Sequence, residues 1–248
     1  MESHDMSAPQ FKDVATALAL LTRFPVKAEF DRTAEASWAY PIAGTVLGTC
    51  AAVLIAVCLW LGVAPALAAG IYVAATIVLS GAMHEDGLAD CADGFWGGWD
   101  QTRRLEIMKD SAIGAYGVIA LVLSLITRWA AIWLLIEGGW WFFPLIVIET
   151  LSRSAMPAVM HALPNARDTG LSQSQGRPDR ATAALAVAGA SVLSLLLIGL
   201  TTVPLLILGT AVVAAMAMLA RAKIGGQTGD VLGATQQITA LVLLIALA

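Results

Sequence analysis

The sequence predicts an all-α protein: a polytopic membrane bundle of about seven transmembrane helices, with an amphipathic interfacial helix before the first of them. Apolar residues make up 58% of the 248 residues and charged residues only 13%, at a mean hydropathy of +0.78. A soluble domain has roughly 25% charged residues. Apolar runs long enough to cross a bilayer recur along the whole chain. No internal repeat or linker is visible, so we expect a single integral membrane domain over residues 1–248.

The amino-terminal segment, residues 1–39, is expected at the cytoplasmic face and the membrane interface. Within it, Phe11–Phe24 has apolar residues near helical spacing, with Lys12, Asp13 and Arg23 at other positions. This pattern is typical of an amphipathic helix that lies in the interface. The alternative is an eighth crossing, but the three charged residues bracket too few apolar residues for one.

Seven apolar runs are each long enough to be interpreted as a membrane span. They are Tyr40–Val63, Ala66–Met83, Ile113–Ile136, Trp140–Met160, Ala181–Leu200, Pro204–Ala220 and Val231–Ala248. The three cysteines lie in or beside these runs without metal-ligand spacing and imply no disulfide framework.

The distribution of positive charge predicts the orientation. Twelve of the fourteen Lys and Arg residues lie in four segments on one side of the predicted spans: Lys12, Arg23, Lys27 and Arg32; Arg103, Arg104 and Lys109; Arg167, Arg177 and Arg180; Arg221 and Lys223. The three connections on the other side carry no positive charge. Because positive loops stay in the cytoplasm, we expect a multi-pass protein of the cytoplasmic (inner) membrane, with its amino terminus and residues 84–112 in the cytoplasm.

The two remaining arginines lie within predicted spans. Charges at such depth normally face the bundle interior and pair with one another. A turn at Gly138–Gly139 would bring Arg128 to the depth of Glu149, which predicts an Arg128–Glu149 ion pair. Arg153 is one helical turn from Glu149, so it either pairs with that carboxylate or contacts an anionic substrate; both interpretations stay open.

The most informative motif is the acidic segment that follows the second apolar run. Asp86, Asp90 and Asp93 are spaced i, i+4 and i+7, which places them on one face of a helix. Glu85 is a fourth carboxylate, and no positive residue lies within the motif to neutralise it. All-oxygen ligation favours a hard cation such as Mg²⁺, which also binds substrate phosphates. The alternative, a solvated acidic face, fits poorly with the small residues between the acids.

The chain continues from this motif into a basic stretch. Arg103, Arg104 and Lys109 would supply the positive charge that a diphosphate needs, although arginines at a membrane boundary are also topology signals. Asp110 and Ser111 follow, and Ser111 is placed to cap the next helix.

Two further cytoplasmic segments are candidates for the same site. The loop around Arg167 is of a kind that can close over a nucleotide. In the last segment, Gly226 and Thr228 belong to a glycine-rich turn whose N–H groups can face phosphate oxygens. That turn opens a helix whose amino terminus favours anions, and Asp230 adds a carboxylate at the level of Asp86. The residues together predict a metal-dependent enzyme that works on phosphorylated substrates at a membrane surface.

The chain resembles the cobalamin-5′-phosphate synthases, also called adenosylcobinamide-GDP ribazoletransferases. The resemblance extends over nearly all 248 residues and is carried by Leu21–Val26, Tyr40–Pro41, Asp86–Asp90 with Asp93–Gly94, Leu105–Ser111, Ser152–Arg153, Ala166–Arg167 with Gly170–Leu171, and Gly225–Asp230 with Leu232–Ala234. Three positions depart from the family pattern: Glu85 stands where relatives often have leucine, and Gln237 and Ala240 stand where acidic residues are expected.

The resemblance implies an Mg²⁺-dependent reaction in the last steps of cobalamin nucleotide-loop assembly. Adenosylcobinamide-GDP would react with α-ribazole or its 5′-phosphate to give adenosylcobalamin or its phosphate, with release of GMP. The implied metal ligands are Asp86, Asp90 and Asp93, with Glu85 as a further one. The implied catalytic residues are Asp86, Asp90, Asp93, Lys109 and Asp110. The implied substrate-binding residues are Arg103, Arg104, Ser111, Arg153, Arg167, Gly226, Thr228 and Asp230.

Two other classes of function are alternatives. A CDP-alcohol phosphotransferase of lipid synthesis also sets spaced aspartates at a cytoplasmic helix end, but its usual motif is absent here. A transporter would place acids near the bilayer midplane, whereas the acids of this chain are predicted at the cytoplasmic boundary. Besides the two substrates, we expect the lipid bilayer as a partner and no nucleic acid; pathway enzymes and a second copy of the chain are further candidate partners.

Overall fold

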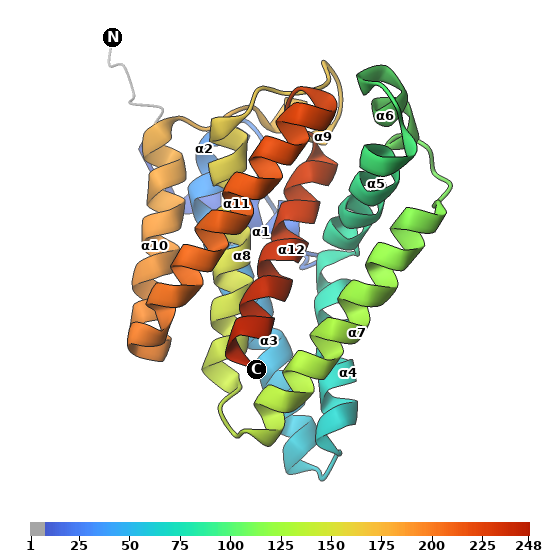
Figure 1. Ribbon diagram of the computed structural model, residues 1–248. Coiled ribbons are helices and arrows are strands. Elements are labelled where there is room, and N and C mark those ends of the chain that lie inside the picture. Colours follow the sequence, from blue (N-terminus) through green and yellow to red (C-terminus); the bar gives the residue numbers. More distant parts are fainter. Residues whose placement is uncertain (1–7) are drawn as a thin grey trace.

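The computed structural model describes residues 8–248, and these residues form helices without a β-strand (Figure 1). The amino-terminal part of the predicted segment 1–39, residues 1–7, lies outside them. The helices are α1 (Phe11–Leu21), α2 (Thr33–Ala36), η1 (Ser37–Ala39), α3 (Tyr40–Trp60), α4 (Pro65–Ser80), α5 (Met83–Gly97), α6 (Gln101–Ile107), α7 (Ala115–Glu137), α8 (Phe142–Ala162), α9 (Leu171–Gln175), α10 (Arg180–Ile198), η2 (Gly199–Thr201), α11 (Thr202–Ile224) and α12 (Gly229–Leu247). The all-α class and the short helix at Phe11 are confirmed.

The predicted count of seven spans is not confirmed. Within residues 8–248, five helical stretches are long and apolar enough to cross a membrane, or six if the bent pair α4 and α5 forms one span. One of the five, residues 180–224, contains both α10 and α11. These two helices meet at η2, where Gly199 has a positive φ of 61°, and they run in opposite directions in Figure 1.

The second predicted span ends earlier than expected, because the chain breaks between α4 and α5. Gly81 and Ala82 both have positive φ (70° and 59°), and the two helices are bent by 90°. A left-handed alanine is unfavourable, so surrounding contacts must hold it. Arg23 contacts the residues just before it: its backbone N–H donates to the Leu79 carbonyl at 2.7 Å, and its guanidinium fills the space where a Gly81 side chain would lie.

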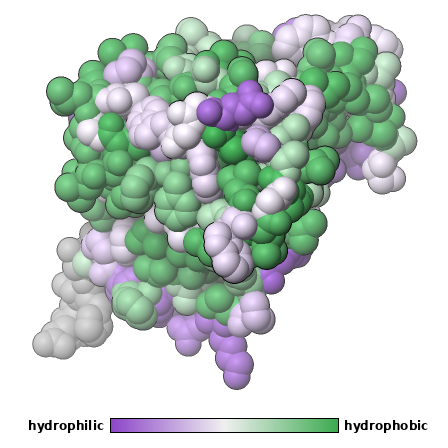
Figure 2. All heavy atoms as spheres, turned by 90° about the horizontal axis from the view of Figure 1, so that it is seen from below, coloured by the Kyte–Doolittle hydropathy of each residue, from purple (hydrophilic) through white to green (hydrophobic). Residues whose placement is uncertain are grey.

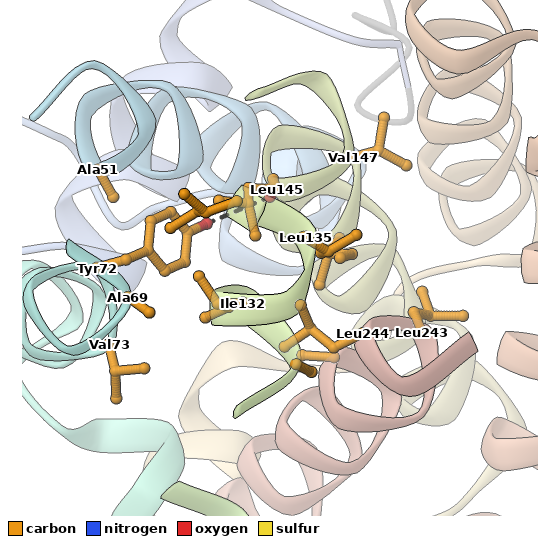
Figure 3. Close-up of a cluster of buried hydrophobic side chains, with 14 of the residues drawn as sticks. Ala51, Ala69, Tyr72, Val73, Ile132, Leu135, Leu145, Val147, Leu243 and Leu244 are labelled. Atoms are coloured by element: carbon orange, nitrogen blue, oxygen red, sulfur yellow. Dashed lines mark hydrogen bonds between the residues drawn. The ribbon is translucent and has the colours of Figure 1, made fainter. Parts of the chain in front are cut away.

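The centre of the bundle is α8, which is buried along most of its length between α3, α10, α11 and α12. The close approach of α3 requires glycine: a Cβ on Gly44 would lie 2.2 Å from the Glu149 carbonyl oxygen. Figure 3 shows the apolar cluster next to it, where the Tyr72 hydroxyl donates to the Leu145 carbonyl oxygen at 3.3 Å. Leu243 and Leu244 of α12 complete the cluster.

The buried ion pairs differ from the prediction. Arg128 does not pair with Glu149; its Nη1 donates to Glu85 of α5 at 3.1 Å and to Gln237 of α12 at 2.8 Å. Glu149 instead pairs with Arg153, four residues later on the same helix. The reason is rotational: Arg128 faces α5 and α12 rather than α8. Of the two interpretations of Arg153, the structure therefore contains the ion pair.

The two ends of the bundle differ in character. One end, called the acidic end here because it holds the acidic helix α5, also contains α6, α9 and the amino terminus of α12. It carries the loops and short helices at the top of Figure 1. The opposite end holds the short α3–α4 and α7–α8 turns. Seen from that end, the surface is mostly hydrophobic, with scattered hydrophilic residues (Figure 2).

Candidate active site

The acidic motif forms helix α5, which packs closely against the amino terminus of α12. Gly87 makes this approach possible, because a Cβ there would lie 2.7 Å from the backbone oxygen of Asp230 and 3.0 Å from its Cα. The two neighbouring acids of α5, Asp86 and Asp90, are thereby brought to the side of Asp230. The predicted convergence of the acidic motif with the glycine-rich segment that ends at Asp230 is present in the structure.

Negative charge accumulates at this junction with little compensation. Asp90 is partly buried; the like charges of Asp230 and Asp86 repel its carboxylate, and the opposite charge of Arg167 attracts it. Arg167 pairs with Asp230 at 3.5 Å, and the Thr228 hydroxyl donates to the same carboxylate at 3.1 Å. One guanidinium therefore faces three carboxylates, which is an arrangement that attracts a cation.

The other two acids of the motif have different partners. Both oxygens of buried Asp93 accept backbone N–H groups at the start of α7, from Gly114 at 2.7 Å and from Gly117 at 2.9 Å. Glu85 is buried in the ion pair with Arg128. Ser111 does not cap α7, since the cap residue is Gly114 and it is Asp93 that accepts the N–H groups of Gly114 and Gly117. The structure thus separates Asp93 and Glu85 from Asp86 and Asp90.

Within residues 8–248, no three His, Cys, Asp or Glu side chains converge tightly enough to hold a metal ion by themselves. Mg²⁺ is usually bound by one or two carboxylates together with substrate phosphates and water. Asp86, Asp90 and Asp230 fit that donor set, because they are oxygen ligands that share one face of the α5–α12 junction. Asp93 and Glu85 fit it less well, because Asp93 accepts two backbone N–H groups at the start of α7 and Glu85 is paired with Arg128.

A two-segment bridge holds the polar side of the site together. Residues 164–166 pair with the glycine turn: the Ala166 N–H donates to the Gln227 carbonyl at 2.9 Å, and the Gln227 N–H donates to the Pro164 carbonyl at 2.8 Å. Gly226 must be glycine here, since a Cβ would lie 2.3 Å from the Pro164 oxygen. The Gln227 side chain bonds Asn165 and Ser172. Gly226 therefore builds the site through its backbone.

A cavity of about 230 Å³ lies beneath this bridge. Its polar lining comes from the bridge, from α5, from the start of α12 and from residues 169–175, which include α9; its apolar lining comes from α1, α3, α5, α8 and α12. The lining includes Asp86, Arg167, Thr228 and Asp230 among the predicted residues. Three further lining residues, Asn165, Gln227 and His84, were not among the predicted site residues. Asn165 and Gln227 lie in segments whose other residues are predicted, so their neighbours could have indicated them. For His84, the only signal in the sequence is the acidic residues that follow it.

A second hollow, more open and about 380 Å³ in volume, lies between α6 and the loop after α8. Lys109 lines it, and it shares Arg167 and Thr169 with the cavity. Arg167 also donates to the Leu105 carbonyl of α6 at 3.1 Å. Arg167 therefore lies at the boundary between the two spaces.

The remaining predicted residues lie outside both spaces. Arg104 donates to the carbonyl groups of Gly98, Trp99 and Lys223, at 2.9, 3.3 and 3.1 Å, and so ties α6 to α11. Exposed Arg103 pairs with Glu106 at 3.1 Å. Asp110 accepts the Ala112 N–H at 3.0 Å in the exposed turn that also holds Ser111. Arg153 is buried with Glu149.

Comparisons with known proteins point to one family. A family model described as cobalamin-5-phosphate synthase matches residues 13–248. A protein named adenosylcobinamide-GDP ribazoletransferase from Mesorhizobium japonicum is 42% identical over 237 residues, covering 94% of this chain and 91% of that protein. Proteins of the same name from Bradyrhizobium diazoefficiens (41% identical, 94% of this chain, 92% of that protein) and Brucella ovis (39%, 95% and 95%) are also similar. No solved structure matches.

Proposed function

Because the chain belongs to the cobalamin-5-phosphate synthase family, a family of cobalamin biosynthesis, we propose that it is an Mg²⁺-dependent adenosylcobinamide-GDP ribazoletransferase of the cytoplasmic membrane. The observation that carries the proposal is the similarity of about 40% to transferases of that name along nearly the whole chain. The acceptor is α-ribazole or its 5′-phosphate, and the reaction takes place at the acidic end of the bundle, on the cytoplasmic side.

The proposed reaction is a transfer at phosphorus. A ribose hydroxyl oxygen of the acceptor forms a bond to the phosphorus next to cobinamide, and the bond from that phosphorus to the GMP oxygen breaks. The hydroxyl proton passes to a carboxylate or to water, and GMP leaves with the electron pair. Charge neutralisation and in-line placement provide most of the catalysis in such a transfer.

The acids of the α5–α12 junction would hold the cation. Asp86, Asp90 and Asp230 are the residues to bind Mg²⁺, which when bound would neutralise the diphosphate and polarise it toward attack. The same carboxylates are the nearest acceptors for the hydroxyl proton. Asp93 contributes by capping α7 and fixing α5, and Glu85 by anchoring the same helix through Arg128.

Arg167 and Lys109 would hold the departing nucleotide. Both line the open hollow, and Arg167 reaches the acids as well. A guanidinium at that boundary can donate two parallel hydrogen bonds to two oxygens of one phosphate group. Arg104 is fully engaged with backbone carbonyls, so its proposed role is to position α6, and Arg103 lies on the exposed side of that helix.

The proposal is tested by measuring GMP release from adenosylcobinamide-GDP by the purified protein. Release should require both Mg²⁺ and α-ribazole, and chelation should abolish it. Asp86→Asn and Asp230→Asn should each lower kcat by about 100-fold, as expected for loss of a group that stabilises developing charge. Absence of GMP under every condition would refute the transferase function.

Asp31→Asn is the matched control for the loss of a carboxylate. Asp31 is exposed, pairs with Lys12 at 3.2 Å and touches neither the cavity nor the hollow. Its kcat should stay within about twofold of the parent. A comparable loss in this variant would show that the effect of the asparagine substitutions is not specific to the junction.

A further inference from the structure

The cavity at the α5–α12 junction has two unlike walls. One wall is polar and carries Asn165, Gln227 and Thr228 together with Asp86 and Asp230. The apolar part of the lining is formed by the residues Leu20, Leu21, Tyr40, Met83, Met156 and Met160. A ligand that fits this cavity has one apolar part and one part rich in hydroxyl groups.

The size of the cavity restricts the ligand further. Its volume of about 230 Å³ is below the roughly 300–1,000 Å³ typical of pockets for drug-sized molecules. A corrinoid carrying a nucleotide is far larger than such a molecule. A single bicyclic base with its sugar is of the right order.

The apolar wall discriminates between the two bases in the reaction. Guanine presents several donors and acceptors along its edges, and burying these against leucine and methionine would leave them unpaired at a cost. The base of α-ribazole is a dimethylbenzimidazole, which has one free ring nitrogen and two methyl groups. The flexible thioethers of Met156 and Met160 suit a flat apolar ring. His84 lines the same cavity, and its Nε2 has no hydrogen-bond partner within residues 8–248.

The second hollow offers a different environment. It is open, its lining has no methionine, and it contains Lys109 and Arg167 together with the acidic residues Glu106 and Asp168, so that a bound cation or these two basic side chains would have to offset the acids. This is the place for a diphosphate and a solvated purine. Arg167 lines both the cavity and the hollow and pairs with Asp230. A ligand in the cavity and a ligand in the hollow would therefore meet beside Asp86 and Asp230.

We infer that the cavity at the α5–α12 junction is the acceptor subsite: it binds the apolar base of the ribazole against its apolar lining from α1, α3, α5 and α8, and it directs the ribose hydroxyls toward Asp86 and Asp230. The inference rests on the proposed function and adds to it the location and selectivity of one substrate. The nucleotide end of the other substrate then lies in the open hollow.

Two substitutions on α1 test the inference. Leu20 and Leu18 are both partly buried leucines that pack against the same apolar cluster, but only Leu20 lines the cavity. Leu20→Trp should weaken binding of α-ribazole, measured by equilibrium dialysis in detergent, by about tenfold or more, which corresponds to the loss of roughly one well-packed contact. Leu18→Trp should leave it within about twofold.

A substrate pair adds a second readout. The riboside of unsubstituted benzimidazole lacks the two methyl groups, so a narrowed cavity should penalise it less than α-ribazole. In Leu20→Trp the preference for the dimethylated base should shrink or reverse, while the KM for adenosylcobinamide-GDP stays within about twofold.

Three results would overturn the inference: equal binding of α-ribazole by the two variants, a raised KM for adenosylcobinamide-GDP in place of weaker ribazole binding, or no binding of α-ribazole by the parent protein. Failure of the proposed function has a different signature. In that case the parent binds α-ribazole, and Leu20→Trp weakens that binding, but no GMP is released.

Discussion

Arg128 is a buried cation whose Nη1 has two oxygen partners from different helices. Glu85 of α5 accepts at 3.1 Å and Gln237 of α12 at 2.8 Å, while Nη2 donates to Thr76 at 3.2 Å. The Gln237 amide also donates to Glu85 at 3.0 Å. A carboxylate at position 85 or at position 237 would therefore neutralise the same nitrogen. Only the first of these two positions is charged in this chain.

Moving the carboxylate from position 85 to position 237 should preserve most of the stability of the protein. Glu85→Gln leaves the guanidinium without a counter-charge, and breaking a buried pair in this way costs about 3–5 kcal/mol. Thermal unfolding in detergent should show a clear loss of stability. Adding Gln237→Glu to that variant returns a carboxylate to Nη1, so at least half of the loss should be recovered. A double variant no more stable than the single one would show that position 237 cannot supply the counter-charge.

At the scale of helices, the contact between α5 and α12 determines whether the acids meet. The contact is made through backbone atoms, because Gly87 lies directly against Asp230. Gly233, one turn further along α12, lies against His84 in the same way, with a Cβ at 3.1 Å from its Cα. Neither helix can move closer or rotate without changing the spacing of Asp86, Asp90 and Asp230.

Gly87→Ala should separate these helices. The added methyl group would meet the Asp230 backbone oxygen at 2.7 Å, and overpacking of this kind costs about 1–3 kcal/mol. We expect a lower unfolding temperature and a fall in GMP release at least as large as the fall in folded protein. Gly189→Ala is the control: no atom lies within 4 Å of its Cβ, so the same change in α10 should be neutral or slightly stabilising. Equal effects at both positions would rule out a special role for the α5–α12 contact.

At the scale of the whole molecule, the two ends differ in loops and in charge. The acidic end carries α6, α9 and the two ligand-sized spaces. Of the lysines and arginines, twelve lie in the four segments that the sequence assigns to one side. The opposite end is closed by short turns, one of them after the exposed residue Glu137.

The proposed orientation is tested by cysteine labelling. In a background with Cys50, Cys58 and Cys91 replaced by alanine, Glu137→Cys should react with a membrane-impermeant maleimide in intact cells. Glu106→Cys, at an exposed position in α6 at the acidic end, should react only after permeabilisation. The reverse pattern would place the site on the outer face and contradict the orientation.

Most helices follow directly from the local sequence. The run predicted at Tyr40–Val63 is α3, Tyr40–Trp60; the run at Ile113–Ile136 is α7, Ala115–Glu137; and the run at Trp140–Met160 is α8, Phe142–Ala162. Their apolar character persists over whole helices, so bounds are recovered within a few residues. The break at Gly81–Ala82 was not predicted, because it lies where Arg23, from a distant segment, contacts Leu79 and Gly81.

The amino-acid order by itself determined the all-α membrane class and the helical acidic motif, and it predicted which segments come together at the candidate site, because hydropathy and residue spacing are local properties. Only the tertiary structure decided the partner of each charge. Asp93 resembles Asp86 and Asp90 in type and spacing, yet it caps α7, and Arg128 pairs with Glu85 in place of Glu149. The physical reason is that an ion pair or a cap depends on the rotation and depth of two helices, which are set by packing between segments far apart in the chain.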